Sequence, residues 1–258
     1  MTEEVAPGFR AFVARTFGDE GRAWLTSLPA VLDELAGAWQ LTLGRELIGG
    51  LLSLVREATT VEGRAVVLKV GAPWPRALDE LTALTRWSGV GAPGVIELST
   101  EHRAVVLERI LPGTHPDPGE PGAVASVLRR LHVDSPATIP ELEEIVRRRL
   151  ATAVRDRRLS ADRGARALET AMELTSSASS QVLLHGDFDD RNLLVCERQG
   201  LVAIDPLPCA GDPAYDAAYW AHANGRSGRR ERQRAIAAEL GLDPGRVRRW
   251  GTVVAAHG

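Results

Sequence analysis

The sequence predicts an α+β protein with a small, sheet-rich N-terminal part and a larger, mostly helical C-terminal part. Between residues 40 and 110, short apolar and β-branched runs are punctuated by glycine, as strands joined by tight turns are. After a stretch rich in proline and glycine at residues 114–122, the pattern becomes mostly helical. At 258 residues, the chain is long enough for one large domain or for two lobes.

The composition is that of a soluble globular protein. Apolar residues make up 44% of the chain and charged residues 25%, and the net charge of -3 gives no electrostatic reason to expect nucleic acid as a partner. No charged-then-apolar leader follows Met1, and no apolar run reaches the length of a membrane span. Cys196 and Cys209 do not form a disulfide framework and suit a reducing compartment. We therefore expect a cytoplasmic monomer that binds no nucleic acid and no membrane.

The N-terminal part is expected to begin with two helices, over residues 2–18 and 19–39, and the second is expected to kink or break at Pro29. A sheet with one helix should follow. Its strands are predicted over residues 40–47, 51–59, 64–70, 95–98 and 104–110, and the helix over residues 75–88. Gly49-Gly50 and Glu62-Gly63 would form the first two turns of the sheet, and the last two strands would form a hairpin.

The C-terminal part is expected to contain helices and one hairpin. The helices are predicted over residues 123–132, 140–158, 161–176, 229–240 and 243–256. Another should start at Asp212-Pro213, because an acceptor side chain followed by proline is a strong N-terminal signal. Two apolar segments, 193–195 and 201–204, flank a turn and should pair. The arginines at 147–149 follow several glutamates, so we interpret them as a solvated, salt-bridged helix face.

The most informative stretch begins at His185-Gly186-Asp187, where an apolar run enters a polar loop. Asn192 lies five residues beyond Asp187, and Asp205 ends the next apolar run. Kinase-type phosphoryl transfer needs a carboxylate to orient the attacking hydroxyl and accept its proton, plus an Asn and a second Asp to hold magnesium on the phosphates. Taken singly, each of these residues is more often a turn former or a helix cap. Their combination favours Asp187 as the base and Asn192 and Asp205 as magnesium ligands.

Lys69 is the only lysine among the 31 basic residues of the chain and lies in the apolar run 65–70. Solubility does not require it, because arginine serves at every other basic position. A compact ammonium that reaches phosphate oxygens from within a sheet would explain the choice, since the guanidinium is bulkier and planar. The alternative is a surface lysine without a role. Gly49-Gly50 would also let backbone amides approach nucleotide phosphates, although no G-x-G-x-x-G pattern supports this.

The chain resembles the aminoglycoside phosphotransferase family of kinase-like enzymes, in particular its branch of aminoglycoside and hydroxyurea resistance kinases. The resemblance extends from Trp24 to Trp220 and rests on Leu184-His185-Gly186-Asp187, Asn192, Ala203-Ile204-Asp205-Pro206-Leu207-Pro208-Cys209 and Gly211-Asp212-Pro213-Ala214-Tyr215-Asp216. It implies a bilobal protein-kinase-like fold with lobes at residues 1–110 and 111–258. It also implies that ATP or GTP binds with Mg²⁺ in the cleft, where Lys69 contacts the phosphates.

A kinase-like fold implies two further nucleotide contacts. A glutamate on the helix after the lysine strand pairs with the lysine and fixes it against the phosphates. Glu80 is the natural partner of Lys69, and Asp79 competes with it from one position earlier. The hinge, whose backbone hydrogen-bonds adenine, would include Glu108 and Ile110.

The resemblance further implies a cationic small-molecule substrate. Many relatives continue His-Gly-Asp with a loop of the type Leu-His-x-Gly-Asn, whereas this chain has Phe188-Asp189-Asp190-Arg191-Asn192. Streptomycin carries two guanidinium groups, which the carboxylates of Asp189, Asp190, Asp212 and Asp216 would attract. The expected reaction is ATP-dependent phosphorylation of an aminoglycoside hydroxyl, namely the 6-hydroxyl of streptomycin, which would confer resistance.

Three other functions stay open at this point. The same fold could serve as a kinase of hydroxyurea, a sugar or another small metabolite. An inactive nucleotide-binding module is a second alternative, which the intact set of Lys69, Asp187, Asn192 and Asp205 disfavours. A hydrolase that uses Asp187 and Asp205 as paired carboxylates would leave Lys69 and Asn192 unexplained. The Walker pattern is absent, so a P-loop fold is not expected.

Overall fold

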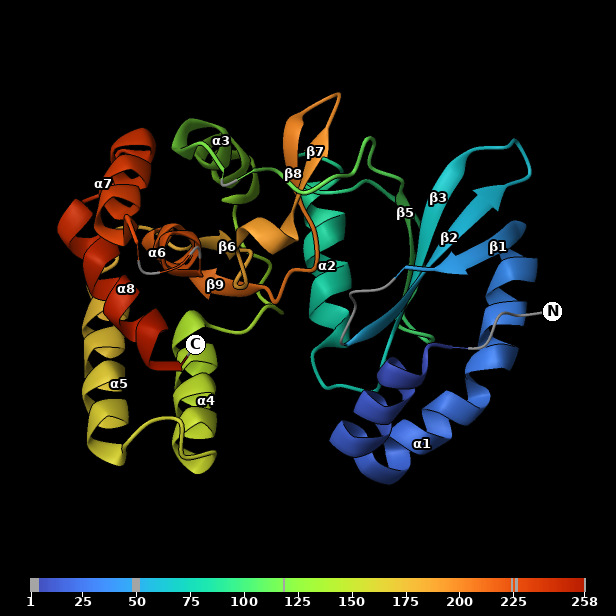
Figure 1. The fold of residues 1–258 in the computed structure, drawn as a ribbon, viewed down its shortest axis with the longest axis horizontal. Coiled ribbons are helices and arrows are strands. Elements are labelled where there is room, and N and C mark those ends of the chain that lie inside the picture. Colours follow the sequence, from blue (N-terminus) through green and yellow to red (C-terminus); the bar gives the residue numbers. More distant parts are fainter. Residues whose placement is uncertain (1–4, 48–51, 118, 224, 226, 258) are drawn as a thin grey trace. The chain divides into compact units, whose positions relative to one another are not determined.

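The computed structural model describes residues 5–47, 52–117, 119–223, 225 and 227–257. The chain forms two compact units, one comprising Met1–Gly89 and Pro93–Arg109 and the other Val90–Ala92 and Ile110–Gly258. Figure 1 shows the elements of both units along the chain. The lobe boundary after residue 110 stays a prediction, and the observed units differ from it at Ile110 and in the short segment Val90–Ala92.

The first unit begins with a long helix, α1 (Pro7–Ala38), which consists of two helical segments that meet at Gly18. Gly18 has a φ of 57° and a ψ of -130°, a conformation that is essentially restricted to glycine. The two helices predicted on either side of this position are confirmed. A break at Pro29 is wrong, because the helix continues through this proline, whereas a kink there stays a prediction. A proline removes one backbone hydrogen bond, and the buried neighbours Leu28 and Leu32 hold the helix on the sheet.

An antiparallel sheet follows α1. Its strands are β1 (Leu41–Glu46), β2 (Ser53–Thr60), β3 (Ala65–Gly71), β4 (Val95–Ser99) and β5 (Ala104–Glu108), in the spatial order β1-β2-β3-β5-β4. All five strands were predicted. The turn between β2 and β3 contains Gly63 with a φ of 79°, as expected for a glycine turn. The other predicted turn, Gly49-Gly50, lies outside the described residues.

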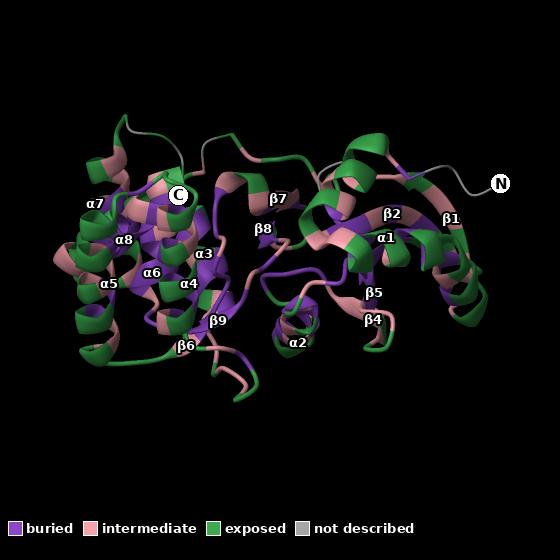
Figure 2. Ribbon diagram, turned by 90° about the horizontal axis from the view of Figure 1, so that it is seen from below, coloured by how far each residue is buried: buried purple, intermediate pink, exposed green. Residues whose placement is uncertain are grey.

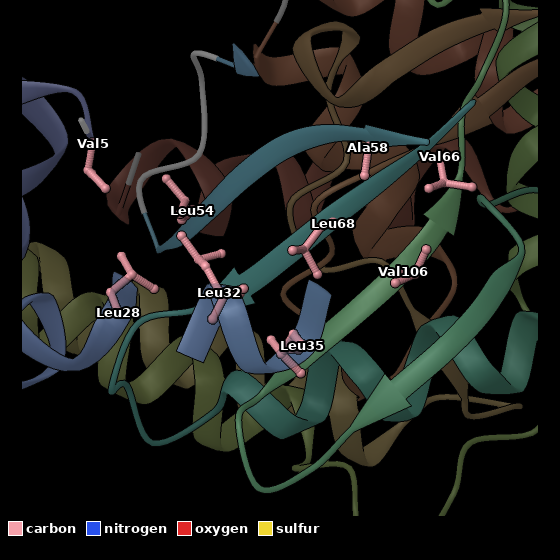
Figure 3. Close-up of a cluster of buried hydrophobic side chains, with 11 residues drawn as sticks. Val5, Leu28, Leu32, Leu35, Leu54, Ala58, Val66, Leu68 and Val106 are labelled. Atoms are coloured by element: carbon pink, nitrogen blue, oxygen red, sulfur yellow. The ribbon is translucent and has the colours of Figure 1, made fainter. Parts of the chain in front are cut away.

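The core of the first unit lies between α1 and one face of this sheet. Figure 3 shows Leu28, Leu32 and Leu35 of α1 against alternate residues of the strands. The strand residues of this cluster are Leu54, Ala58, Val66, Leu68, Val70, Ala104 and Val106. Because successive strand residues point to opposite faces, Lys69 projects from the face away from α1. Helix α2 (Ala77–Trp87) supplies a partner for Lys69 on that other face.

The second unit is mostly helical. Its helices are α3 (Pro121–Leu131), α4 (Leu142–Arg155), α5 (Ala161–Ser176), α6 (Ala214–Ala223), α7 (Arg229–Leu240) and α8 (Pro244–His257), as predicted. Helix α6 is buried along most of its length, whereas α4 and α5 each expose one side (Figure 2). None of the helices in the described part of the chain has the length and apolar character that crossing a membrane would require.

Two small strand pairs lie among these helices. The predicted hairpin is present as β7 (Leu193–Cys196) and β8 (Gly200–Ala203). A second pair, β6 (Val182–Leu184) with β9 (Cys209–Gly211), was not predicted, because three residues are too few to show a strand periodicity. Strand β6 ends directly before His185, and because the pair is antiparallel this end lies beside Cys209, at the start of β9. The pair therefore brings the His185-Gly186-Asp187 motif next to the segment that follows Asp205.

Candidate active site

The loop that carries Asp187 is joined to the loop that carries Asp205 by three hydrogen bonds. His185 Nε2 donates to the carbonyl of Ile204 at 2.9 Å. The amide of Ile204 donates to the carbonyl of Asn192, and the amide of Leu207 donates to the carbonyl of His185, both at 2.9 Å. A carbonyl oxygen only accepts, so Nε2 carries the hydrogen of the imidazole. Burial lowers the pKa of His185 and keeps the ring neutral in this role.

The carboxylate of Asp187 receives one hydrogen bond on each oxygen. Tyr219 of α6 donates its hydroxyl to Oδ1 at 2.5 Å. Asn192 donates its amide Nδ2 to Oδ2 at 3.2 Å and to the Asp187 backbone carbonyl at 2.8 Å. The Asn192 side chain therefore braces Asp187 and turns its own amide oxygen away from it. This geometry suits a carboxylate that must hold a substrate hydroxyl in one orientation.

Asn192 and Asp205 have the chemistry of a magnesium site. The amide oxygen of Asn192 and the carboxylate of Asp205 are the hard oxygen ligands that Mg²⁺ prefers. Asp205 has a φ of 55°, a left-handed conformation that aspartate tolerates better than most residues. No group of three or more His, Cys, Asp or Glu residues suited to a metal occurs within the described ranges. A magnesium ion held here by Asn192 and Asp205 would take its other ligands from phosphates and water, as is usual for this metal.

Asp216 of α6 anchors the start of this loop. It is fully buried and accepts hydrogen bonds from the backbone amides of His185 at 2.8 Å and Gly186 at 2.9 Å. His132, which caps α3, adds a third bond from its Nε2 at 3.1 Å. Burial alone would raise the pKa of Asp216, but the bond from His132, the nearby His185 and the Gly186 amide together lower it. Asp216 is therefore a buried carboxylate whose partners are all internal.

Gly186 provides a direct test of how tightly the loop is packed. Its φ is +78°, and an added Cβ would lie 2.1 Å from the carbonyl oxygen of Leu207. Gly186→Ala should therefore combine backbone strain with a clash against backbone, and we expect it to lower the free energy of unfolding by about 3 kcal/mol or more. Urea denaturation of the parent and the variant measures this difference.

Gly200 offers a matched control for that substitution. Its φ is +76°, and nothing lies within 4 Å of an added Cβ. Gly200→Ala thus keeps the strain and removes the clash, and it should lower the free energy of unfolding by only about 1–2 kcal/mol. Equal losses in the two variants would show that Leu207 does not confine the loop at Gly186.

The other acids predicted to contact substrate have partners within the second unit. Asp189 is buried and forms an ion pair of 2.5 Å with Arg191. Asp190 accepts the indole N–H of Trp220 at 2.7 Å and is only half-buried. Asp212 is buried, caps α6 through the amide of Ala214 at 2.9 Å, and also accepts bonds from Arg246 at 2.6 Å and Trp250 at 2.5 Å. Contacts of these acids and of Asp216 with a substrate stay predictions, and the half-buried Asp190 is the best placed of them to make one.

Two residues that the sequence interpretation missed complete the site. Arg147 and Arg148 pair with Glu143 and Glu144, as predicted for a solvated face. Arg149 instead turns inward, donating to the carbonyl of Gly186 at 2.9 Å and lying 5.6 Å from the ring centroid of Tyr219. Arg149 is spaced four and three residues from the buried Ile145 and Val146, so the helical period could have identified it. Tyr219 lies in a helix that is apolar almost all round, and its sequence carries no comparable signal.

The first unit contains the predicted lysine–glutamate pair. Lys69 Nζ lies 2.5 Å from Glu80 Oε1, and both side chains are largely buried. The competitor Asp79 pairs with Arg76 at 2.7 Å instead. The pairing of Lys69 with Glu80 is therefore confirmed, whereas their contact with a nucleotide stays a prediction.

The predicted hinge lies at the end of β5. The backbone amide of Glu108 donates a hydrogen bond of 2.9 Å to the carbonyl of Gly94. This amide is therefore already bonded within the first unit. Ile110 is buried against Cys196 and Val202 of the second unit, to which it belongs. Adenine recognition by Glu108 and Ile110 stays a prediction, as does the contact of Gly49 and Gly50 with phosphates, because these glycines lie outside the described residues.

The sequence matches known phosphotransferases over most of its length. The model of the aminoglycoside/hydroxyurea antibiotic resistance kinase family matches residues 38–257. A streptomycin 6-kinase from Streptomyces glaucescens is 32% identical over 224 residues, which cover 83% of this chain and 73% of that protein. A hydroxyurea phosphotransferase from Kitasatospora aureofaciens is 30% identical over 247 residues, which cover 90% of this chain and 72% of that protein.

Solved structures support the fold. The crystal structure of a choline/ethanolamine kinase family protein from Mesorhizobium loti matches with a TM-score of 0.66 and 18% identity, over 89% of this chain and 83% of that chain. At this level of identity the match concerns the fold alone. It confirms the kinase-like fold that the sequence predicted.

Proposed function

Because this chain belongs to the aminoglycoside/hydroxyurea antibiotic resistance kinase family, we propose that it transfers the γ-phosphoryl group of ATP to the 6-hydroxyl of streptomycin. Membership makes it a phosphotransferase that acts on a hydroxyl group. The proposal adds the nucleotide, the acceptor and the residues that act. It also adds the consequence, which is resistance to the modified antibiotic.

The observation that carries the proposal is the setting of Asp187. A carboxylate held on both oxygens by Tyr219 and Asn192 is oriented in advance, so little reorganisation is needed when a hydroxyl arrives. The amide of Ile204 bonds to the carbonyl of Asn192 and so holds the residue before Asp205 at Asn192. The amide oxygen of Asn192 and the carboxylate of Asp205 would then supply oxygen ligands for a metal. A carboxylate, an amide and a second carboxylate in this arrangement match the requirements of kinase-type transfer.

In the proposed reaction, Asp187 accepts a hydrogen bond from the 6-hydroxyl of streptomycin. This bond directs the hydroxyl oxygen toward the γ-phosphorus. The new oxygen–phosphorus bond forms as the bond between the γ-phosphorus and the β,γ-bridging oxygen breaks. The hydroxyl proton passes to Asp187, and ADP carries away the electron pair of the broken bond. Mg²⁺, when bound by Asn192 and Asp205, would neutralise charge on the phosphates. Lys69, fixed by Glu80, would supply a further positive charge to the phosphates.

Hydroxyurea is the second candidate acceptor, because a hydroxyurea phosphotransferase is among the relatives at 30% identity. It also presents a hydroxyl, but it is small and uncharged. Streptomycin carries two guanidinium groups that a carboxylate such as Asp190 could bind. We therefore favour streptomycin, and the two acceptors are readily distinguished by experiment.

Mass spectrometry of acceptors incubated with the protein and magnesium-ATP tests this proposal. We expect streptomycin to gain one phosphate, and hydroxyurea and a panel of sugars to gain none at matched concentration. GTP in place of ATP defines the nucleotide preference. Phosphorylation of hydroxyurea alone would replace the proposed acceptor, and magnesium-ATP binding without transfer to any acceptor would indicate an inactive nucleotide-binding module.

A further inference from the structure

We propose that Tyr219 is the positioning residue of the catalytic carboxylate, and that its hydroxyl, backed by the half-buried guanidinium of Arg149, sets the orientation in which Asp187 meets its acceptor. The proposal deepens the function above and rests on it where turnover is concerned. Its basis is a set of contacts among α4, α6 and the loop after β6, all within the second unit.

The hydroxyl of Tyr219 is the stronger of the two constraints on the Asp187 side chain. It donates to Oδ1 at 2.5 Å, whereas the Asn192 amide reaches Oδ2 at 3.2 Å. Both bonds go to the same carboxylate, and a hydrogen bond weakens with distance, so the shorter bond is the stronger constraint. Without the phenol, the carboxylate would be held by the longer contact alone and could rotate about its terminal bond. Tyr219 therefore defines the plane of the carboxylate.

Arg149 contacts both Tyr219 and the loop that carries Asp187. Its guanidinium lies over the Tyr219 ring, with 5.6 Å between Cζ and the ring centroid. It donates one hydrogen bond to the carbonyl of Gly186 at 2.9 Å and another to the hydroxyl of Tyr215 at 2.8 Å. One half-buried cation thus contacts the ring that orients Asp187 and the residue that precedes Asp187. A shift of α6 against the loop would break these contacts together.

The hydroxyl of Tyr219 is a donor at all working pH values. Burial raises the pKa of Tyr219, and the neighbouring Asp187 carboxylate raises it further. Packing and the contact of the ring with Arg149 would be served as well by phenylalanine, which has the same ring face. The one contact that distinguishes tyrosine here is the bond to Asp187, so Tyr219→Phe removes the proposed role and keeps the shape.

Tyr215 provides a matched control one turn earlier on the same helix. Tyr215 is buried and also contacts Arg149, but its hydroxyl lies 2.8 Å from Arg149 and 3.5 Å from His257 Nε2, whereas the hydroxyl of Tyr219 bonds to Asp187. Tyr215→Phe therefore removes the same chemical group from the same helix without removing a donor to the carboxylate. Any general effect of losing a buried phenol should appear in both variants.

The kinetic test compares kcat and KM of the parent, Tyr219→Phe and Tyr215→Phe with streptomycin and magnesium-ATP. A misdirected carboxylate slows the chemical step without weakening binding, so Tyr219→Phe should lower kcat roughly 10- to 100-fold and leave both KM values within about twofold. Tyr215→Phe removes an acceptor of Arg149 but no donor to Asp187, so its kcat should fall less than that of Tyr219→Phe. An unchanged kcat in Tyr219→Phe, or equal losses in both variants, would overturn the proposal.

A second measurement does not depend on turnover and so separates this proposal from the proposed function. Thermal unfolding of Asp187→Ala, Tyr219→Phe and the double variant forms a double-mutant cycle. If the phenol bonds to the carboxylate, the shifts in Tm of the single variants will not add up in the double variant. The same cycle with Tyr215→Phe should be additive. Additivity in both cycles would overturn the pairing of Tyr219 with Asp187, even if the protein phosphorylates streptomycin. Coupling between Tyr219 and Asp187 in a protein that phosphorylates no acceptor would overturn only the proposed function.

Discussion

Replacing Asp187 with asparagine is expected to lower kcat for phosphoryl transfer about 10²- to 10⁴-fold, with little change in KM for streptomycin. Asparagine has nearly the same shape, but its amide cannot accept the hydroxyl proton. Its NH₂ group would also oppose one of the two donors that now contact Asp187, the Tyr219 hydroxyl and the Asn192 amide. Steady-state rates of ADP release, with mass spectrometry of the product, measure this loss.

A carboxylate away from the loop serves as the control for this variant. Asp156 lies at the end of α4, where its side chain is 46% exposed beside Arg155. Asp156→Asn removes one negative charge from the same unit and should leave kcat unchanged within experimental error. If Asp187→Asn retains more than about a tenth of the parental kcat while the control behaves as expected, Asp187 is not the base.

The chemical groups of this site could be predicted from the sequence because their identity and spacing are local properties. Asn192 follows Asp187 closely enough for its amide to fold back on the same loop, as the bond of 2.8 Å to the Asp187 carbonyl shows. Lys69 and Glu80 lie on consecutive elements, so their pairing follows once a strand and a helix are predicted. The fold class likewise follows from strand and helix periodicities that are visible along the chain.

The supports of the site could not be predicted in the same way, because they depend on how distant segments pack. Tyr219 contacts Asp187 across 32 positions of sequence and Arg149 contacts Gly186 across 37. The helical period could place Arg149 on the buried face of its helix, but nothing in a single sequence says that Arg149 and Tyr219 support Asp187 until α4 and α6 are placed against the loop.

The acidic residues show a related difference between charge pattern and structure. From the sequence, Asp212 and Asp216 are predicted to bind the guanidinium groups of a cationic substrate. In the structure, both are buried and bond to backbone amides, indoles or histidine inside the second unit. The partners that bury them come from segments far apart in the sequence, such as His185, which follows β6, and Trp250 of α8. A carboxylate is therefore assigned to substrate or to structure only when its donors are known.

Asp216→Ala is expected to have the largest effect on stability. It would leave the amides of His185 and Gly186 unpaired in the interior and deprive His132 of its acceptor. Each buried donor without a partner costs about 1–3 kcal/mol, and three donors lose their acceptor together. We expect the free energy of unfolding to fall by about 3–5 kcal/mol in urea denaturation at neutral pH, with loss of phosphoryl transfer because the loop start is no longer held.

The pH dependence of this loss separates the charge of Asp216 from its shape. The pKa of Asp216 is lower in the folded protein than in the unfolded chain. Ionisation of Asp216 therefore stabilises the fold fully above the unfolded-state pKa of about 4. This stabilisation is lost as the pH falls through the folded-state pKa. The difference between the parent and Asp216→Ala should thus be full at neutral pH and shrink below about pH 4. Asp216→Asn keeps one acceptor oxygen and should lose less stability than Asp216→Ala. A difference that is independent of pH, or a loss below about 1 kcal/mol in Asp216→Ala, would show that this carboxylate does not hold the loop.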